Sequence, residues 1–146
     1  MTINTDFLTR CILTLESAFA QLQQHEAGST AYDIFRAACV KEFELVLEQS
    51  GSLLGKRLGP YFASNLQADL LTFKDRFRHA AKHGLISVES CERWLGYRDA
   101  RNDTAHRYGA GFADFVKDAE ATLKLLPTFI ADAKELARVI AESTDD

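Results

Sequence analysis

The feature that most constrains this chain is the spacing of its apolar residues, which recur every three or four positions along almost the whole length. This spacing places the apolar residues on one face of a helix. In the first such segment the face comprises Phe7, Cys11, Ile12, Leu15, Ala18, Phe19 and Leu22. The alternating pattern typical of a half-buried strand is missing from the sequence, and β-branched residues are few. The sequence therefore predicts an all-α protein.

Five helices are expected, separated where Gly, Ser or Pro residues interrupt the pattern. Their approximate ranges are 7–22, 30–50, 65–82, 87–108 and 112–142. Short connections between helices favour an up-and-down bundle. We expect one domain over residues 1–146, with a frayed tail at residues 142–146.

The breaks between these helices lead to several local predictions. The segment 51–61 contains three Gly and one Pro and is predicted to be a loop. Thr5 or Asp6 is expected to cap the first helix, and Gly84 to end the third. Pro127 is expected to kink or break the last helix. The third helix is expected to turn inward Leu66, Leu70, Phe73, Phe77 and Ala81.

The charge of the chain is unevenly distributed. The net charge of −4 argues against a protein that coats nucleic acid through its overall charge. The segment 74–107, however, carries eight basic residues against five acidic ones, so that it is basic within an acidic protein. This segment is the first indication of a site for an anion.

The three cysteines Cys11, Cys39 and Cys91 indicate a reducing compartment. Their number is odd, no C-x-x-C motif occurs, and each lies among apolar helical neighbours. The N-terminus lacks the pattern of a signal peptide, and no apolar run approaches the ~18 residues of a membrane span. We therefore expect a cytoplasmic protein that does not interact with a membrane.

One pair of histidines has the spacing of metal ligands. His79 and His83 lie four positions apart and can share one helix face. The glutamate of the H-E-x-x-H motif is missing, and Arg78 and Lys82 beside the pair would repel a cation. We interpret the pair as part of a solvated polar face, and no metal or other cofactor is predicted.

The segment 98–109, RDARNDTAHRYG, concentrates polar residues that can act on a phosphodiester. On a continuous helix, Arg101 and Tyr108 share one face, and Asn102 and His106 share the adjacent face. An Arg offers a planar fork for a phosphate, and a His can take a proton from a 2′-hydroxyl. The alternative is that the cluster only satisfies backbone groups and pairs internally, as polar residues at helix ends often do.

The block from Arg101 to Tyr108 resembles the R-x4-H-x-Y signature of HEPN-fold proteins. It is most similar to the branch of nucleotidyltransferase substrate-binding proteins, which includes HepT-type toxins. The segment 32–48, with its central Phe43-Glu44 pair, resembles the second helix of that branch. The segment 82–109 resembles its Gly-Leu-Ile turn, Trp helix and R-N-x-x-x-H-x-Y block. The resemblance implies a HEPN-type four-helix bundle core and a two-fold dimer.

The resemblance also implies a function and a set of site residues. Members are partners of a minimal nucleotidyltransferase, and the HepT type forms a two-gene toxin–antitoxin module with it. Carried over, Arg101 and His106 form the catalytic pair of a metal-independent RNase, and Tyr108 is the residue modified with AMP. Asn102, Arg98 and Arg107 are expected to bind the phosphates of the RNA substrate. Two departures from the family pattern are Arg107, where relatives often carry a small or hydroxyl residue, and Glu48-Gln49, where they often carry Trp-Lys.

A dimer also follows from the chemistry of the block. Transesterification of RNA needs a base and an acid, and each chain offers one His there. A two-fold axis near residues 101–108 supplies the second copy and doubles the Arg set. Two alternatives are a non-enzymatic subunit that presents substrate to the nucleotidyltransferase, and a purely structural helical dimer. The structural dimer would have Arg101 and His106 buried and paired within one chain.

Overall fold

The computed structural model describes residues 2–106 and 111–142. These ranges contain six α-helices and one short 3-10 helix, joined by turns and loops. No strand occurs within these two ranges, so the prediction of an all-α protein is confirmed. In chain order the elements are α1 (Asp6–Leu22), α2 (Thr30–Leu58), η1 (Gly59–Tyr61), α3 (Asn65–Asp69), α4 (Phe73–Lys82), α5 (Val88–His106) and α6 (Phe112–Ala141).

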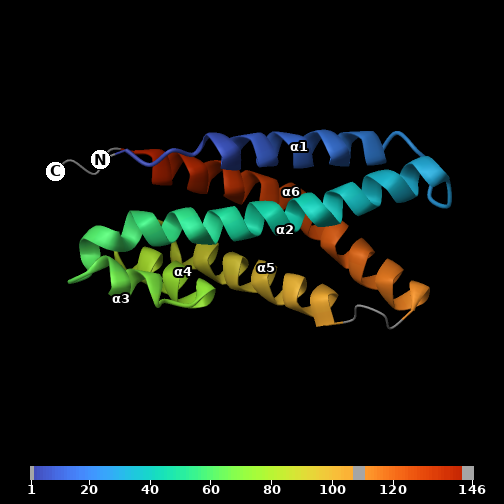
Figure 1. The fold of residues 1–146 in the computed structure, drawn as a ribbon. Coiled ribbons are helices and arrows are strands. Elements are labelled where there is room, and N and C mark those ends of the chain that lie inside the picture. The colour runs from blue at the N-terminus through green and yellow to red at the C-terminus, as the bar shows by residue number, and fades with distance from the viewer. Residues whose placement is uncertain (1, 107–110, 143–146) are drawn as a thin grey trace.

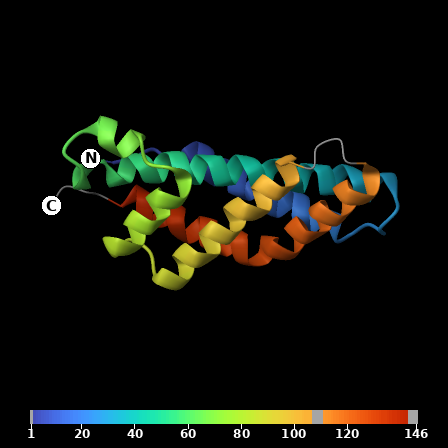
Figure 2. The same ribbon diagram turned by 90° about the horizontal axis from the view of Figure 1, so that it is seen from below.

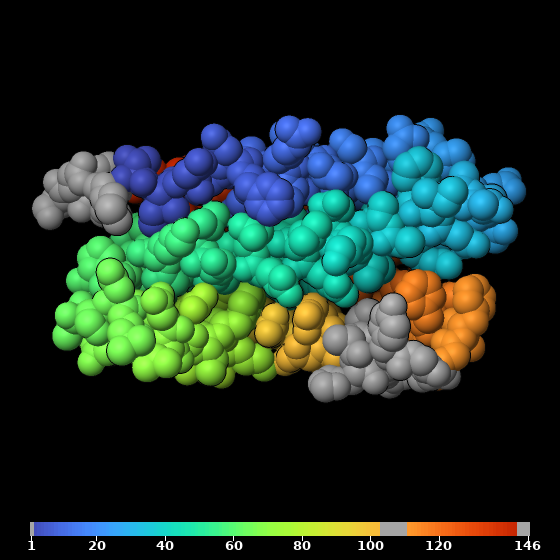
Figure 3. All heavy atoms as spheres, viewed as in Figure 1, coloured from blue at the N-terminus to red at the C-terminus, as the bar shows by residue number. Residues whose placement is uncertain are grey.

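The long helices form an up-and-down bundle. Figure 1 shows α1 and α2 running in opposite directions, followed by α5 running back and by α6 returning, so that both termini lie at one end. Helix α4 is antiparallel to α5, because Lys74 pairs with Asp99 and Phe77 stacks on Trp94. Helix α2 packs against α1, α4 and α6, and α5 packs against α4 and α6. The space-filling view shows α2 as a band of surface between α1 and the α4–α5 pair (Figure 3). The expected bundle topology is confirmed, with six α-helices in place of five.

An aromatic cluster fills the centre of the core, and we name it by its five members, Phe43, Phe77, Trp94, Tyr97 and Phe129. The ring centroids of Phe43 and Phe129 are 4.7 Å apart, as are those of Phe77 and Trp94. All five side chains are buried. Because α5 contributes two of them and α2, α4 and α6 one each, the cluster determines where α5 lies in the bundle.

Helix α2 continues through the segment that the sequence predicts to be a loop. Gly51 and Gly55 lie inside α2 on the side that faces α4. A Cβ atom on Gly51 would lie 2.6 Å from the Phe73 ring, and one on Gly55 would lie 3.0 Å from the Arg76 guanidinium. The prediction was wrong because these glycines allow α4 to approach α2, a tertiary role that a single sequence does not distinguish from a turn.

The substitution Gly51→Ala is therefore expected to lower the free energy of unfolding by about 1–3 kcal/mol, the usual range for overpacking a core. The added methyl group forces the buried edge of Phe73 to move. The matched control is Gly96→Ala in α5, where a Cβ meets no atom within 4 Å. Because Ala favours the helix there, we expect the control to stabilise the protein by about 1 kcal/mol. Equal effects of the two substitutions in urea unfolding would contradict this account.

The predicted third helix is two helices, α3 and α4. Thr72 caps α4 because its hydroxyl oxygen accepts a hydrogen bond of 3.1 Å from the backbone N–H of Asp75. Leu66 and Leu70, expected to face the core, are 67% and 75% exposed. The cap at Thr72 begins a new helix, so the inward face of α4 does not extend back along α3.

The structure tests the predictions on helix caps, on the end of α4 and on Pro127. Gly84 has φ +75° and ends α4, and Ser87 accepts a hydrogen bond from the N–H of Ser90 at the start of α5, as expected. The N-cap of α1 is Thr5, but its side chain makes no capping bond. Helix α6 continues through Pro127, so no break occurs there.

The three cysteines are buried and free, as expected from their apolar neighbours. Burial raises the pKa of the Cys39 thiol to about 11. Within residues 2–106 and 111–142, no helix is both long enough and apolar enough to cross a bilayer. Residues 143–146 of the expected frayed tail lie outside the described residues.

Candidate functional site

Four of the six predicted site residues, Arg98, Arg101, Asn102 and His106, belong to the second half of α5. Figure 2 shows this half of the helix reaching the middle of α2, while the first half lies beside α4. The aromatic cluster holds the first half in the core, and α6 packs along the same helix. The core thus positions residues 98–106 at the edge of the bundle, next to α2.

A polar contact joins α5 to α6 just before the site. Arg93 donates two hydrogen bonds to the Asp132 carboxylate, at 2.8 and 2.9 Å, and the Tyr97 hydroxyl donates a third at 2.6 Å. Burial, and then donation to this carboxylate, raise the pKa of Tyr97 far above its usual range. A bidentate Arg–carboxylate contact restricts rotation of both partners, so it defines which face of α5 is turned toward α2.

Arg101 lies at the contact between α5 and α2. Its Nη2 atom is 3.5 Å from Oε1 of Glu48 in α2, and its side chain is 27% exposed. The Nε atom is buried and makes no hydrogen bond to the described residues. The guanidinium is therefore half-buried, with one edge toward a carboxylate that is itself 56% exposed.

The other candidate phosphate ligands have different surroundings. The Arg98 guanidinium lies 5.0 Å from the centre of the Phe73 ring, a cation–π contact between α5 and α4. Asn102 is partly buried, one position after Arg101. Arg107 lies outside the described residues, so the structure brings together only Arg98, Arg101 and Asn102 on the last turns of α5.

The basic segment 74–107 is largely neutralised by acidic partners. Four of its cations form ion pairs, which are Lys74–Asp99, Arg78–Asp75, Arg93–Asp132 and Arg101–Glu48. The Lys74 and Asp99 atoms are 2.5 Å apart. Two of the four acidic partners, Glu48 in α2 and Asp132 in α6, lie outside the segment and reduce its excess of positive charge. The segment therefore does not form a free basic surface on one chain.

His106 is the last residue of α5, five positions after Arg101. In an ideal helix this spacing corresponds to a rise of about 7.5 Å between the two backbone positions. Tyr108, expected to carry AMP, lies outside the described residues, and so do Gly109 and Ala110 of the predicted break. The following helix begins after Gly111, whose φ of +114° favours glycine.

A buried charge that was not predicted from the sequence joins α2 to the first half of α6. Arg36 is buried, and its guanidinium contacts Asp33 at 3.0 Å and Glu120 at 3.7 Å. The Tyr32 hydroxyl donates a 2.9 Å hydrogen bond to Glu120. The signal was present in the sequence, because Arg36 falls on the apolar face of its helix, three positions before Cys39.

The two candidate zinc ligands contact aromatic rings. The His83 imidazole stacks on Tyr61 with centroids 3.9 Å apart, and His79 meets Phe62 edge-on at 5.1 Å. In the described ranges, no group of three or more His, Cys, Asp and Glu side chains is arranged to hold a metal ion. The pair packs the end of α4 against η1 and the residue that follows it, which is a structural role.

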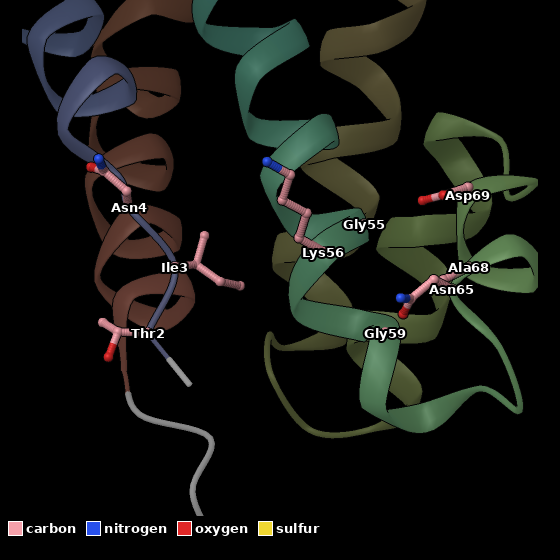
Figure 4. A pocket seen from close by; sticks show the side chains of 9 residues that line it. All are labelled: Thr2, Ile3, Asn4, Gly55, Lys56, Gly59, Asn65, Ala68 and Asp69. Atoms are coloured by element: carbon pink, nitrogen blue, oxygen red, sulfur yellow. The ribbon is translucent and has the colours of Figure 1, made fainter.

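A cleft of about 420 Å³ lies between the N-terminal segment and the end of α2. Figure 4 shows Asn65 and Asp69 on one side and Ile3 on the other. None of the predicted site residues lines this cleft. It belongs to the end of the bundle that carries the termini, whereas the second half of α5 extends toward the opposite end (Figure 1).

Comparison with known proteins finds a family model, a relative and a solved structure that are similar to this chain. A family model described as "nucleotidyltransferase substrate binding protein like" matches residues 6–141. The probable ribonuclease HepT of Haemophilus influenzae is 29% identical over 110 residues, covering 73% of this chain and 74% of that protein. A solved Haemophilus influenzae structure, described as the fold of a substrate binding domain of a nucleotidyltransferase, has a TM-score of 0.76 at 24% identity and covers 95% of this chain and 100% of its own.

Proposed function

This chain belongs to the nucleotidyltransferase substrate binding protein-like family, and from that premise we propose that it is the helical partner of a minimal nucleotidyltransferase in a two-gene toxin–antitoxin module. In this proposal the protein is a cytoplasmic, metal-independent RNase, and the nucleotidyltransferase silences it by transferring AMP to Tyr108. The observation that carries the proposal is the 29% identity to the probable ribonuclease HepT.

The proposed reaction is transesterification of RNA. His106 takes the proton from a 2′-hydroxyl, the 2′-oxygen attacks the adjacent phosphorus, and the bond from phosphorus to the 5′-oxygen breaks. Arg101 binds the phosphate and stabilises the negative charge that develops on it. The half-buried guanidinium of Arg101 supports this role, because it retains an accessible edge at the surface of the bundle.

We further propose that the active form is a two-fold homodimer in which two α5 blocks face each other. Within one chain, acidic partners neutralise much of the basic segment. A second copy brings another set of Arg98, Arg101, Asn102 and Arg107 and a second His106, which can act as the acid that protonates the leaving 5′-oxygen.

The alternative is a non-enzymatic subunit that presents substrate to the nucleotidyltransferase. The description of the family and that of the solved relative favour this function for those proteins. In this chain, the ion pair between Arg101 and Glu48 is compatible with the non-enzymatic function. This alternative predicts a stable complex with the nucleotidyltransferase and no RNA cleavage by the isolated protein.

Co-expression with the product of the neighbouring gene, which the proposal takes to be a nucleotidyltransferase, followed by intact-mass measurement, tests the proposal. We expect the mass of this chain to increase by one or more AMP groups and RNA cleavage to be lost together with that increase. The variant Tyr108→Phe is the matched control, because it removes the hydroxyl that accepts AMP and keeps the ring. A complex without added mass, together with no cleavage by the isolated chain, would favour the non-enzymatic alternative.

A further inference from the structure

The contact between Arg101 and Glu48 has the geometry of an ion pair that a phosphate can replace. The distance between Nη2 and Oε1 is 3.5 Å, whereas strong charge-assisted contacts between nitrogen and oxygen are about 2.7–2.9 Å long. Only the Nη2 atom of the guanidinium takes part in this contact, and the Glu48 side chain is 56% exposed to water. Exposed single contacts of this kind add little to stability.

The two partners differ in how firmly the bundle holds them. Arg101 is 27% exposed and its Nε atom is buried, so packing positions the guanidinium independently of Glu48. The Glu48 side chain is exposed on the surface of α2, so less packing holds it in place. If the Glu48 carboxylate moves away, the Arg101 guanidinium stays near its present position. Its N–H groups can then donate to another anion.

A phosphodiester suits this fork better than the Glu48 carboxylate does. Its two non-bridging oxygens can accept two parallel hydrogen bonds from one guanidinium, while the carboxylate accepts one in the structure. Once displaced, Glu48 has Glu44 one turn before it and Ser52 one turn after it, so neither position offers it a new cation. Glu48 therefore competes with a phosphate for Arg101.

We propose that Glu48 is an internal competitor for the phosphate of RNA, a specificity-determining residue that occupies Arg101 in the free protein and must leave it when substrate binds. This inference rests on the proposed function only in taking Arg101 as the phosphate ligand. If Glu48 competes in this way, ligands with a single phosphate bind Arg101 weakly, because each must first displace the Glu48 carboxylate.

The test measures binding separately from cleavage. The full chain carrying His106→Ala is titrated against a fluorescein-labelled single-stranded RNA oligonucleotide by fluorescence anisotropy, with and without Glu48→Gln. We expect Glu48→Gln to lower the Kd about two- to five-fold, the size of an exposed ion pair. In an Arg101→Ala background the same substitution is expected to change the Kd much less.

The matched control is Glu92→Gln, which makes the same change of net charge at an exposed position of α5. An equal gain in affinity for this control would show a general charge effect and overturn the proposal. Weaker binding with Glu48→Gln, an unchanged Kd, or no RNA binding by either protein would overturn it as well. Tighter binding with Glu48→Gln but no cleavage by the wild-type chain would support the competitor and contradict the RNase function.

Discussion

Replacement of His106 by Ala is expected to reduce RNA cleavage by the full-length protein at least a hundred-fold. Removing a general base costs about 10²- to 10⁴-fold in rate, because the 2′-hydroxyl is a weak nucleophile until its proton is removed. The measurement is the initial rate of cleavage of an RNA oligonucleotide that carries a fluorophore and a quencher. The circular dichroism spectrum of the variant should remain that of a helical bundle, since His106 is the last residue of α5.

The matched control is His79→Ala, which removes an imidazole from the same chain at a distance from the α5 block. His79 lies in α4 and contacts the Phe62 ring, so we expect full cleavage and at most a small loss of stability. Cleavage that persists in the His106→Ala variant would exclude His106 as the base. Loss of cleavage in both variants would show that the effect is not specific to the α5 block.

Replacement of Phe129 by Ala should lower the free energy of unfolding by about 3–5 kcal/mol, the usual cost of truncating a buried Phe. Phe129 is fully buried and contacts three rings of the aromatic cluster, which are Phe43, Trp94 and Tyr97. The cavity left behind would lie between α2, α5 and α6. Urea unfolding followed by circular dichroism measures the difference, and the same cavity should loosen α5 and lower RNA cleavage.

The variant Phe7→Ala is the control, because it removes the same side chain from a surface position. Phe7 begins the apolar stripe of α1 in the sequence, but its side chain is 56% exposed. We expect a change within about 0.5 kcal/mol, as for most surface substitutions. A loss at Phe7 as large as that at Phe129 would mean that the face of α1 carrying Phe7 is covered in the protein in solution.

The elements that could be predicted from the sequence are those determined by neighbouring residues. The α4–α5 turn is an example, because Gly84 adopts a positive φ and Ser87 caps the next helix through a bond to its own first turn. Both effects act within four residues, so periodicity and capping preferences are enough to locate them.

The elements that could not be predicted depend on a partner helix. The same residue type ends a helix at Gly84 and continues one at Gly51, and only the Phe73 ring packed against Gly51 distinguishes the two cases. Leu66 and Leu70 have the spacing of a buried face, yet the chain turns before α4 and leaves both exposed. Local periodicity carries no information on whether another helix covers a given face.

The same division holds for the candidate site. The polar segment 98–109 identified Arg98, Arg101 and Asn102 and the helix that carries them, but not their partners. Glu48 is 53 positions from Arg101, and Asp132 is 39 positions from Arg93. Ion pairs between residues this far apart depend on how the helices pack in the bundle. No spacing rule along the sequence predicts them.

By itself, the sequence determined that this protein is an all-α bundle and where its candidate site lies along the chain. Both follow from helical periodicity and from residue chemistry, which act over a few neighbouring positions. The tertiary structure alone decided that α2 continues through its glycines, that acidic partners neutralise much of the basic segment, and that Arg101 meets Glu48. These three outcomes depend on close packing and charge pairing between distant segments, which exist only when the helices are brought together.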